Sequence, residues 1–254
     1  MTSAAGPLAG LTALVTGSTR GLGRVIAAGY AAAGARVVVV GRRPESCRQA
    51  AGEISADTGA ETIPVACHVG MWAALDGLVE DAYRQAGRID VLVNNAGIAP
   101  TYPSAADITE DLFDKTVAVN LKGPLRLGAL VGSRMAADGR GGSIINVSSV
   151  SAIRPRPATM VYAAAKAGLG AVTIALAQEY APSVRVNTIM AGPFRTDIAR
   201  HWDMSVTGPR LRSYPAGRAG EPGEILGAAL YLAGPASSYV TGSVIRVDGG
   251  MAIT

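Results

Sequence analysis

The residues of this 254-residue chain best suited to acid–base chemistry are a tyrosine and a lysine four positions apart. Tyr162 and Lys166 lie in an alanine-rich, helix-like segment. Side chains at i and i+4 share one face of a helix, so the phenol and the ammonium come within reach of each other. A nearby positive charge stabilises the phenolate and brings the phenol toward the range of a general acid or base. Chance also produces such spacings, so the pair needs support from its surroundings.

Two further polar residues have candidate roles. Ser149 ends the strand-like run 142–149, and a side chain at the carboxyl end of a parallel strand faces the ligand crevice. Capping a turn is the commoner use of a serine, and it stays open for Ser149. Asn120 falls within the helix-like run 113–131, where its amide competes with the backbone. It indicates either a local kink or a functional amide.

A glycine-rich turn, residues 16–23, follows the first strand-like run. Gly17, Gly21 and Gly23 stand between that strand and a helix, although Ile26 occupies the third glycine position of GxGxxG. Such glycines let the backbone approach a pyrophosphate, and the helix N-terminus offers free N–H groups to it. A tight turn that binds no ligand is the alternative.

The position that selects between the two nicotinamide cofactors carries no acid. An NAD site places Asp or Glu about 20 residues after the turn, where this chain has Gly41 followed by Arg42 and Arg43, with Arg20 in the turn itself. Guanidinium groups suit a 2′-phosphate. We therefore expect NADP(H), with NAD(H) as the second cofactor to test. The alternative is that the arginine pair only opens the next helix beside Pro44.

These residues need a scaffold, and the pattern of apolar runs predicts one. Short β-branched runs alternate with helix-length segments, and runs without polar positions indicate strands covered on both faces. The sequence therefore predicts a single α/β domain over residues 1–254, a Rossmann-type, doubly wound parallel sheet of seven strands that combines dinucleotide binding with catalysis. The predicted strands are residues 11–16, 36–40, 62–67, 89–93, 143–147, 184–190 and 244–247.

A long irregular stretch, residues 194–218, interrupts the alternation. It holds Phe194, Trp202, Met204 and Tyr214, and exposed loops rarely carry so many large apolar side chains. We expect a substrate lid at about residues 194–218, with a floppy surface loop as the alternative.

Composition excludes several classes of protein. Hydrophobic residues make up 49% and charged residues 17%, which excludes disorder and indicates subunit contacts. The net charge of +4 is not gathered in a basic block, so no nucleic-acid partner is expected. Cys47, Cys67, His68 and His201 lack metal-ligand spacing, so we expect no metal. Without a signal-like N-terminus or a membrane-length apolar run, a cytoplasmic protein with no membrane partner is expected.

Taken together, the motifs resemble the short-chain dehydrogenase/reductase family over essentially the whole chain, including 3-oxoacyl-(acyl-carrier-protein) reductase-like and sugar dehydrogenase-like members. The resemblance rests on the turn 16–23, the Asn-Asn-Ala-Gly run 94–97, the ending 247–250, and Asn120, Ser149, Tyr162 and Lys166. It implies an oxidoreductase, commonly a homotetramer that pairs helices of the kind at residues 108–134 and 158–180.

The resemblance also implies a role for each catalytic residue. Tyr162 would donate a proton to the substrate carbonyl oxygen, or accept it in oxidation. Lys166 would bind the nicotinamide ribose and lower the pKa of Tyr162, and Ser149 would hydrogen-bond the reacting oxygen. Asn120 would hold a water that links Lys166 to solvent, and Thr196 would bind the carboxamide.

The residues expected to bind the cofactor come from the glycine turn, the strand ends and the start of the lid. They are Gly17, Ser18, Thr19, Arg20, Gly21, Leu22, Gly23, Arg42, Arg43, His68, Val69, Asn94, Ala96, Gly97, Tyr162, Lys166, Gly192, Pro193, Phe194 and Thr196.

The chain departs from the family in two places. His68 stands where an acid usually meets the adenine amino group, and a neutral imidazole still accepts a hydrogen bond. After the sixth strand, Ala191 and Gly192 replace the usual Pro-Gly pair and Pro193 follows, which puts the geometry of the lid hinge in question.

The function expected is an NADP(H)-dependent interconversion of a ketone and a secondary alcohol. The alternative is a catalytically silent NADP-binding redox sensor or structural subunit. The expected substrate walls are Ile98, Tyr102, Val150, Ser151, Ile153, Phe194, Trp202 and Met204, and they favour a partly apolar ligand. Arg154 and Arg156 would either recognise an anion or remain solvated. A sugar or polyol, a 3-oxoacyl thioester and a bulky ketone all stay open as small-molecule carbonyl or alcohol substrates.

Overall fold

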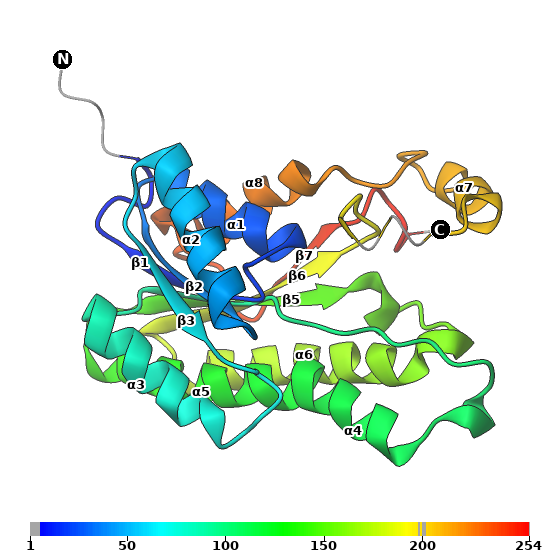
Figure 1. Ribbon diagram of the computed structural model, residues 1–254, viewed down its shortest axis with the longest axis horizontal. Helices are drawn as coiled ribbons and strands as arrows, with labels where there is room; N and C mark the ends of the chain where they lie inside the picture. Colours follow the sequence, from blue (N-terminus) through cyan, green and yellow to red (C-terminus); the bar gives the residue numbers. More distant parts are fainter. Residues whose placement is uncertain (1–5, 198, 200–201, 254) are drawn as a thin grey trace.

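The computed structural model describes residues 6–197, 199 and 202–253. The core is one seven-stranded parallel sheet in the order β3-β2-β1-β4-β5-β6-β7, shown in Figure 1. This confirms the predicted Rossmann-type sheet. The strands are β1 Thr12–Thr16, β2 Arg36–Gly41, β3 Thr62–Ala66, β4 Val91–Asn94, β5 Gly142–Ser149, β6 Val184–Ala191 and β7 Val244–Val247.

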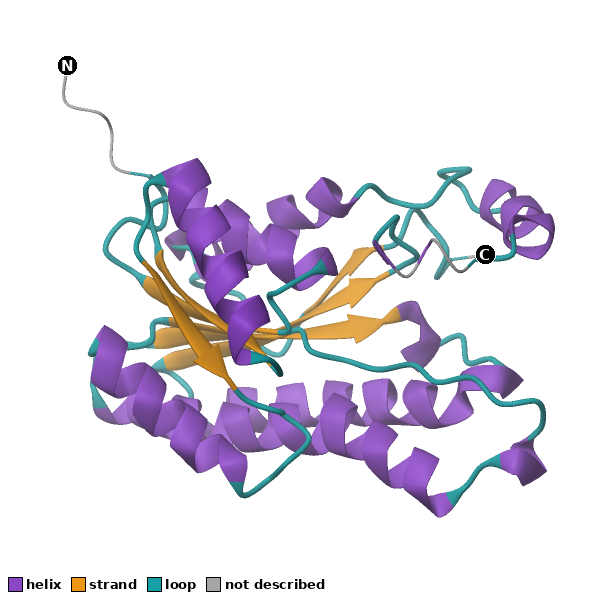
Figure 2. Cartoon of the chain, viewed as in Figure 1, coloured by secondary structure: helices purple, strands orange, loops and turns teal. Residues whose placement is uncertain are grey.

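Helices cover both faces of the sheet (Figure 2). On one face lie α1 Gly21–Ala32, α2 Pro44–Thr58 and α8 Leu226–Ala233; on the other lie α3 Ala74–Ala86, α4 Glu110–Val117, α5 Gly123–Ala137 and α6 Met160–Glu179, and α7 Met204–Arg212 stands apart. A π-helical turn, Ala118–Lys122, joins α4 to α5. Short 3-10 turns occupy Ala105–Asp107, Val150–Ala152, Pro157–Thr159, Pro222–Ile225 and Pro235–Ser237.

Two apolar cores hold these layers together, and β2 shows why. Its valines alternate between the cores: Val37 and Val39 pack with α1, α2 and α8, whereas Val38 and Val40 pack with α3 and α5. A strand buried on both faces needs this uninterrupted apolar run. The run that predicted a parallel strand therefore also divides the interior in two.

The sheet creates a crevice where its strand order reverses. β1 pairs with β2 on one side and β4 on the other, and the connections leave in opposite directions. In doubly wound sheets, ligands bind outside the carboxyl ends of the strands at this switch point. The turn after β1 and the run 94–97 after β4 lie side by side there.

A buried chain of polar side chains ties β4, β5, β6 and α6 together. The Asn94 amide donates to the Asn146 oxygen at 2.9 Å, and the Asn146 amide donates to the Thr173 hydroxyl at 2.9 Å. Thr173 in turn lies 2.9 Å from the Thr188 hydroxyl. Satisfied polar networks in a core fix one arrangement, since any shift leaves a buried group unpaired. The network thus sets the position of α6 against the sheet.

One helical segment, Pro157–Glu179, is long and apolar enough by length and composition to cross a membrane. Its buried side belongs to the core of this fold, because Lys166, Leu169 and Thr173 face β5 and β6. The opposite side carries small residues and the half-exposed Ile174. In this fold the segment packs as a helix against one face of the doubly wound sheet.

The stretch 194–218 is more regular than expected, because it contains α7. Asp203 caps this helix by accepting from the Ser205 backbone N–H at 2.9 Å. At the base of the stretch, Arg195 N–H donates to the Gly220 carbonyl and Gly220 N–H donates to that of Pro193, both at 2.9 Å. Leu211, Tyr214 and Ala219 form a small separate core with Trp202 and Met251. His201, which belongs to this stretch, lies outside the described residues.

Candidate active site

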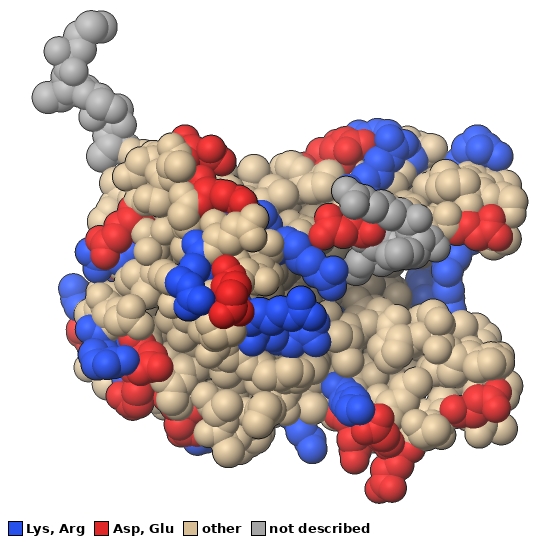
Figure 3. Space-filling model, in the orientation of Figure 1, with Lys and Arg blue, Asp and Glu red and all other residues tan. Residues whose placement is uncertain are grey.

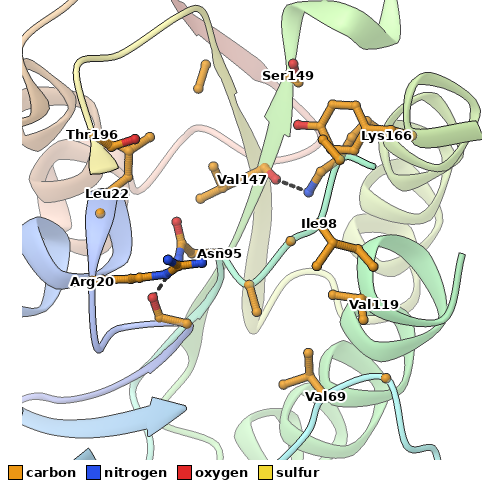
Figure 4. A pocket seen from close by; sticks show the side chains of 18 of the residues that line it. Arg20, Leu22, Val69, Asn95, Ile98, Val119, Val147, Ser149, Lys166 and Thr196 are labelled. Carbon is orange, nitrogen blue, oxygen red and sulfur yellow. Dashed lines mark hydrogen bonds between the residues drawn. The ribbon is translucent and has the colours of Figure 1, made fainter. Parts of the chain in front are cut away.

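A pocket of about 810 Å³ opens at the carboxyl ends of the strands. Figure 4 shows its two ends, with Ser149 and Lys166 at one and Val69 at the other. Its walls come from the turn after β1, the ends of β2 and β3, the run after β4, the end of β5, α6, and the segment after β6. The volume suits an extended cofactor together with a small substrate.

Lys166 is the buried cation of this pocket. Its ammonium donates to the Val147 carbonyl at 2.7 Å, the bond drawn in Figure 4, and the Ser148 hydroxyl donates to the Lys166 carbonyl at 3.1 Å. These two bonds, one through the side chain of Lys166 and one through its backbone carbonyl, hold α6 against β5. Burial lowers the pKa of Lys166 to about 8, because the charged form loses its hydration.

Tyr162 lies one helical turn before Lys166, whose Nζ is 5.9 Å from the centre of the phenol ring. In the protein alone the pKa of Tyr162 is raised, because burial outweighs the opposing hydrogen bond with Ser149. The expectation that Lys166 and a positively charged nicotinamide together lower the pKa of Tyr162 applies to the loaded pocket and stays a prediction.

Ser149 serves both uses that the sequence left open. Its Oγ accepts from the Ser151 backbone N–H at 3.1 Å, so it caps the turn Val150–Ala152. The same hydroxyl lines the pocket and interacts with Tyr162. Because this capping bond uses only a lone pair of the Ser149 Oγ, the hydroxyl hydrogen stays available to donate a hydrogen bond within the pocket.

Tyr102 fixes the start of α6 instead of lining the pocket. It is 6% exposed and outside the pocket lining, and its Oη accepts from the backbone N–H groups of Met160 at 2.6 Å and Val161 at 3.4 Å. Thr159, at the N-cap of α6, makes no side-chain cap. The phenol therefore satisfies N–H groups that the helix start leaves free.

Asn120 occupies the π-helical turn, so the predicted kink is present. Its side chain is fully buried; Nδ2 donates to the carbonyls of Ile98 and Thr116 at 2.8 Å, and Oδ1 accepts from Ile98 N–H at 3.3 Å. Both amide hydrogens are therefore engaged, which excludes them from holding a relay water. The backbone carbonyl of Asn120 lacks the usual i+4 donor, because Pro124 has no N–H.

The glycine turn is shaped for a close approach of backbone and ligand. Gly17 has a φ of 66°, and a Cβ there would lie 2.9 Å from the Ala96 Cα. The first turn of α1 has neither a side-chain cap nor an acidic residue. Its N–H groups and positive dipole end are open to an anion. The turn thus fits a pyrophosphate.

Basic side chains stand beside this turn. Arg20 and Arg42 both line the pocket next to Gly41, and no carboxylate lines that end of it among the described residues. Figure 3 shows Lys and Arg gathered at the middle of the face it draws, beside the hollow between α7 and α4. This arrangement fits a 2′-phosphate.

The structure brings most of the predicted cofactor residues to the lining: Gly17, Thr19, Arg20, Gly21, Leu22, Arg42, His68, Val69, Ala96, Gly97, Tyr162, Lys166, Gly192, Pro193, Phe194 and Thr196. Of the substrate walls, Ile98, Phe194 and Trp202 line the pocket. Val150, Ser151, Ile153 and Met204 do not.

Five predicted site residues lie outside the lining: Ser18, Gly23, Arg43, Asn94 and Asn120. Ser18 is buried, with its hydroxyl bonded to the Val15 carbonyl at 2.7 Å, and Asn94 belongs to the buried network. Arg43 is the exposed N-cap of α2. Gly23 packs against Asn95 and Gly17 too tightly for any side chain. Apart from Arg43, these residues support the site from behind its surface.

The sequence reasoning missed Asn95, which lines the pocket. Its amide donates to the Thr16 carbonyl at 2.9 Å and to that of Gly17 at 3.3 Å, so it braces the turn. The Asn-Asn pair was the signal, but it did not say which asparagine faces the ligand. Cys67, Gly70, Lys115 and Val119 also line the pocket without having been predicted.

The described part of the chain offers no group of three or more His, Cys, Asp or Glu that could hold a metal ion. Cys47 and Cys67 are both buried free thiols, and burial raises the pKa of each.

The chain is similar to several known proteins over nearly its whole length. A family model described as enoyl-(acyl carrier protein) reductase matches residues 17–252. Dehydrogenase/reductase SDR family member 4 of Homo sapiens is 36% identical over 96% of this chain and 88% of its own length. Two further relatives are 36% identical over 97% of the chain: the D-threitol dehydrogenase of Mycolicibacterium smegmatis, covered to 94%, and the 3-oxoacyl-(acyl-carrier-protein) reductase FabG of Chlamydia trachomatis, covered to 99%.

Solved structures agree. A short-chain type dehydrogenase/reductase from Mycobacterium marinum has a TM-score of 0.90 at 33% identity, with 97% of each chain covered. A gluconate 5-dehydrogenase from Burkholderia cenocepacia J2315, in complex with NADP and tartrate, has a TM-score of 0.92 at 33% identity, again with 97% of each chain covered. The chain belongs to the short-chain dehydrogenase/reductase family. It is an oxidoreductase of alcohols and their carbonyl counterparts.

The buried lysine predicts a pH dependence of stability. With a pKa of about 8 in the folded protein and 10.5 as its ordinary value, the unfolded chain binds more protons between these limits, so the free energy of unfolding rises with pH there. Lys166→Met removes this contribution. The advantage of the variant over the wild type should shrink by about 2 kcal/mol between about pH 7 and 9.5 in urea unfolding. A difference independent of pH would contradict the burial of the charge.

Proposed function

We propose that this protein is an NADP(H)-dependent oxidoreductase that interconverts a ketone and a secondary alcohol, with Tyr162 as general acid and base. The observation that carries the proposal is the placement of Ser149, Tyr162 and Lys166 at one end of a pocket whose other end is basic. A redox sensor or structural subunit has no use for such a polar cluster beside an apolar wall.

The nicotinamide supplies the hydride to the carbonyl carbon or accepts it from the alcohol. The chain supplies the proton. Tyr162 gives its phenolic proton to the carbonyl oxygen in reduction and takes it back in oxidation, while the Ser149 hydroxyl donates a hydrogen bond to the same oxygen. Lys166, held at the Val147 carbonyl, binds ribose hydroxyls and favours the phenolate.

The proton route beyond Lys166 involves the backbone at Asn120. The side-chain amide of Asn120 is hydrogen-bonded to the backbone of Ile98. We therefore assign the backbone carbonyl of Asn120, in the π-helical turn, to holding a water near Lys166. Gly97 makes room: a Cβ there would lie 2.9 Å from the Asn120 Oδ1 and 3.8 Å from the Lys166 Nζ. The role of Asn120 is therefore to shape the relay.

The preference for NADP(H) rests on Arg20 and Arg42. Both guanidinium groups line the pocket where β2 ends, and Gly41 leaves no carboxylate for a ribose 2′-hydroxyl. The similar gluconate 5-dehydrogenase structure contains NADP, which supports the same choice here.

We propose that residues 194–218 close over substrate as the lid of a single 1–254 domain. Phe194 and Trp202 line the pocket, and with Ile98 they give it a partly apolar wall. The Gly192–Pro193 hinge is followed at once by the Pro193–Gly220 backbone bond that closes the base of the lid. A small-molecule carbonyl or alcohol binds beneath it.

We also propose a homotetramer that uses the exposed face of α6. Ala164, Ala167, Ala171 and Ile174 are exposed there, and small side chains allow a second helix to approach closely. Ile174→Arg should lower the assembly state in sedimentation velocity, because it places a charge in the contact. Gln85→Arg adds the same charge at an exposed polar position of α3, away from this face, and serves as the control. A wild-type monomer would refute this assembly.

Tyr162→Phe tests the acid–base assignment. The variant keeps the ring and loses the proton, so turnover should fall by about 10³-fold or more, whereas NADPH binding, followed by fluorescence titration, should be retained. The substrate is found first, by following NADPH and NADH oxidation with 3-oxoacyl thioesters, keto-sugars, cyclic diketones and bulky aromatic ketones. Full activity in the variant would remove Tyr162 from the mechanism. A silent wild type that still binds NADPH would favour the sensor alternative.

Arg42→Asp tests the cofactor preference. The carboxylate repels a 2′-phosphate and accepts from a 2′-hydroxyl, so the ratio of kcat/KM with NADPH to that with NADH should fall by about 10²-fold. Arg43→Asp is the matched control, since Arg43 lies outside the pocket lining. Equal shifts in the two variants would mean that only the general charge of the region matters.

A further inference from the structure

The segment that follows β7 is attached near both ends of the lid, residues 194–218. Just before the lid begins, the Gly192 N–H donates to the Val247 carbonyl at 2.9 Å. Near its other end, the Ala216 N–H donates to the Gly249 carbonyl, also at 2.9 Å. Figure 1 shows the chain after β7 turning toward the lid and α7. Residues 247–250 therefore connect the two places where the lid leaves the sheet.

Two glycines bring the lid and this C-terminal segment into close contact. Gly249 and Gly250 have φ angles of 62° and 83°. A Cβ at Gly249 would lie 2.9 Å from the Ala216 Cβ, and a Cβ at Gly250 would lie 2.6 Å from the Pro215 Cγ. Both the conformation and the short distances require glycine. The end of the lid thus rests directly on the backbone after β7.

Asp248 fixes the shape of the turn that these glycines form. One carboxylate oxygen accepts from the Gly250 N–H at 3.0 Å, and the other accepts from the Ala252 N–H at 2.8 Å. Hydrogen bonds to a carboxylate are stronger than those between neutral groups. The two bonds lie on either side of Met251 in the chain, so they set where that residue is placed.

Met251 packs against the lid from outside the pocket. Its side chain lies against the small lid core that Leu211, Tyr214 and Ala219 form, and Trp202 lies against the same core. Trp202 lines the pocket, whereas Met251 does not. Because a packed core transmits a change of volume to its neighbours, the side chain of Met251 affects where Trp202 stands.

Arg154 ties Met251 to the loop that follows β5. Its Nη1 donates to the Met251 carbonyl at 2.7 Å. The sequence left an anion-binding role and a solvated role open for Arg154, and this bond to the C-terminal segment is neither. Since Ser149 ends β5 five residues earlier, the bond also connects the support of the lid to the strand that carries the site serine.

We propose that Met251 is a positioning residue for the substrate: through the lid core it holds Trp202 as the outer wall of the pocket. The proposal rests on the proposed function, because it needs a substrate beneath the lid. Truncating Met251 leaves a cavity beside the lid core, so Trp202 loses its fixed place. Substrate binding then weakens, whereas the proton transfer at Tyr162 keeps its geometry.

Tryptophan fluorescence tests the packing without any turnover. The chain has two tryptophans, Trp72 and Trp202, so Trp72→Phe leaves Trp202 as the single reporter. In that background Met251→Ala should raise the acrylamide quenching constant about twofold or more, because the loosened lid core exposes the indole. Arg154→Gln should raise it by less, since its bond is exposed. Ile253→Ala, which truncates a 73% exposed side chain of the same segment, is the control and should not change it.

Steady-state kinetics tests the effect on substrate. With the carbonyl compound that the wild type reduces best, Met251→Ala should raise KM about fivefold and change kcat less than about twofold. The Kd for NADPH should stay the same, because Met251 lies outside the pocket lining. Met251→Leu conserves the volume and should restore the wild-type KM. Met251→Val, a smaller truncation than alanine, should give the same changes at reduced size and replaces it if the alanine variant does not fold.

The outcomes separate this proposal from the function beneath it. Quenching that is the same in the wild-type background and in the truncated variants would overturn the positioning role and leave the proposed function intact. Raised quenching with an unchanged KM, or an equal loss in kcat at unchanged KM, would also overturn it. A wild type that neither binds NADPH nor reduces any carbonyl would overturn both. Raised quenching together with a raised KM that Met251→Leu reverses supports the proposal.

Discussion

The site depends on one interaction, the bond from the buried Lys166 ammonium to the Val147 carbonyl. A charge without water is stable only where its partners stay fixed, so α6 must keep its register against β5. The Asn94–Asn146–Thr173 chain holds the middle of the helix, and Tyr102 holds its first turn. These contacts set the position of Tyr162, because it lies on α6 between the first turn, which Tyr102 caps, and Lys166.

At the cofactor end of the pocket, by contrast, no side chain caps the backbone N–H groups at the start of a helix. The start of α1 has no cap, and the glycines around it place backbone where side chains would block a ligand. The side chains of Asn95 and Ser18 donate hydrogen bonds to backbone carbonyls in and beside this turn, and these bonds maintain its shape. One end of the pocket is therefore rigid because its bonds are complete, and the other is receptive because its bonds are not.

The sequence predicted all seven strands of the sheet, because strands covered on both faces require apolar runs such as that of β2, and the spacing of Tyr162 and Lys166 predicted that both side chains reach one site, where they line the same pocket. It could not show which atoms of a polar side chain are already engaged. Asn94, Asn120 and Ser18 have suitable chemistry, yet each side chain is turned to the interior by hydrogen bonds that form only in the folded protein. The bond from the Gly70 N–H to the His68 Nδ1 and the capping of α6 by Tyr102 likewise arise only from folding. Helix α7 escaped prediction because its own residues carry a weak helical pattern.

The π-helical turn between α4 and α5 has a consequence for helix phase. It adds about one residue to a turn, and one residue corresponds to about 100° of rotation in an α-helix. What reads as one continuous amphipathic helix is thus two helices that are out of phase around nearly the same axis. α4 buries Thr116, whose backbone carbonyl accepts from the Asn120 amide, whereas α5 buries Leu127, Val131 and Met135 in the core. Deleting one residue of this turn would rotate α4 by about 100° relative to α5. The residue that α4 now buries would then leave the interior, although the sequences of α4 and α5 themselves would be unchanged.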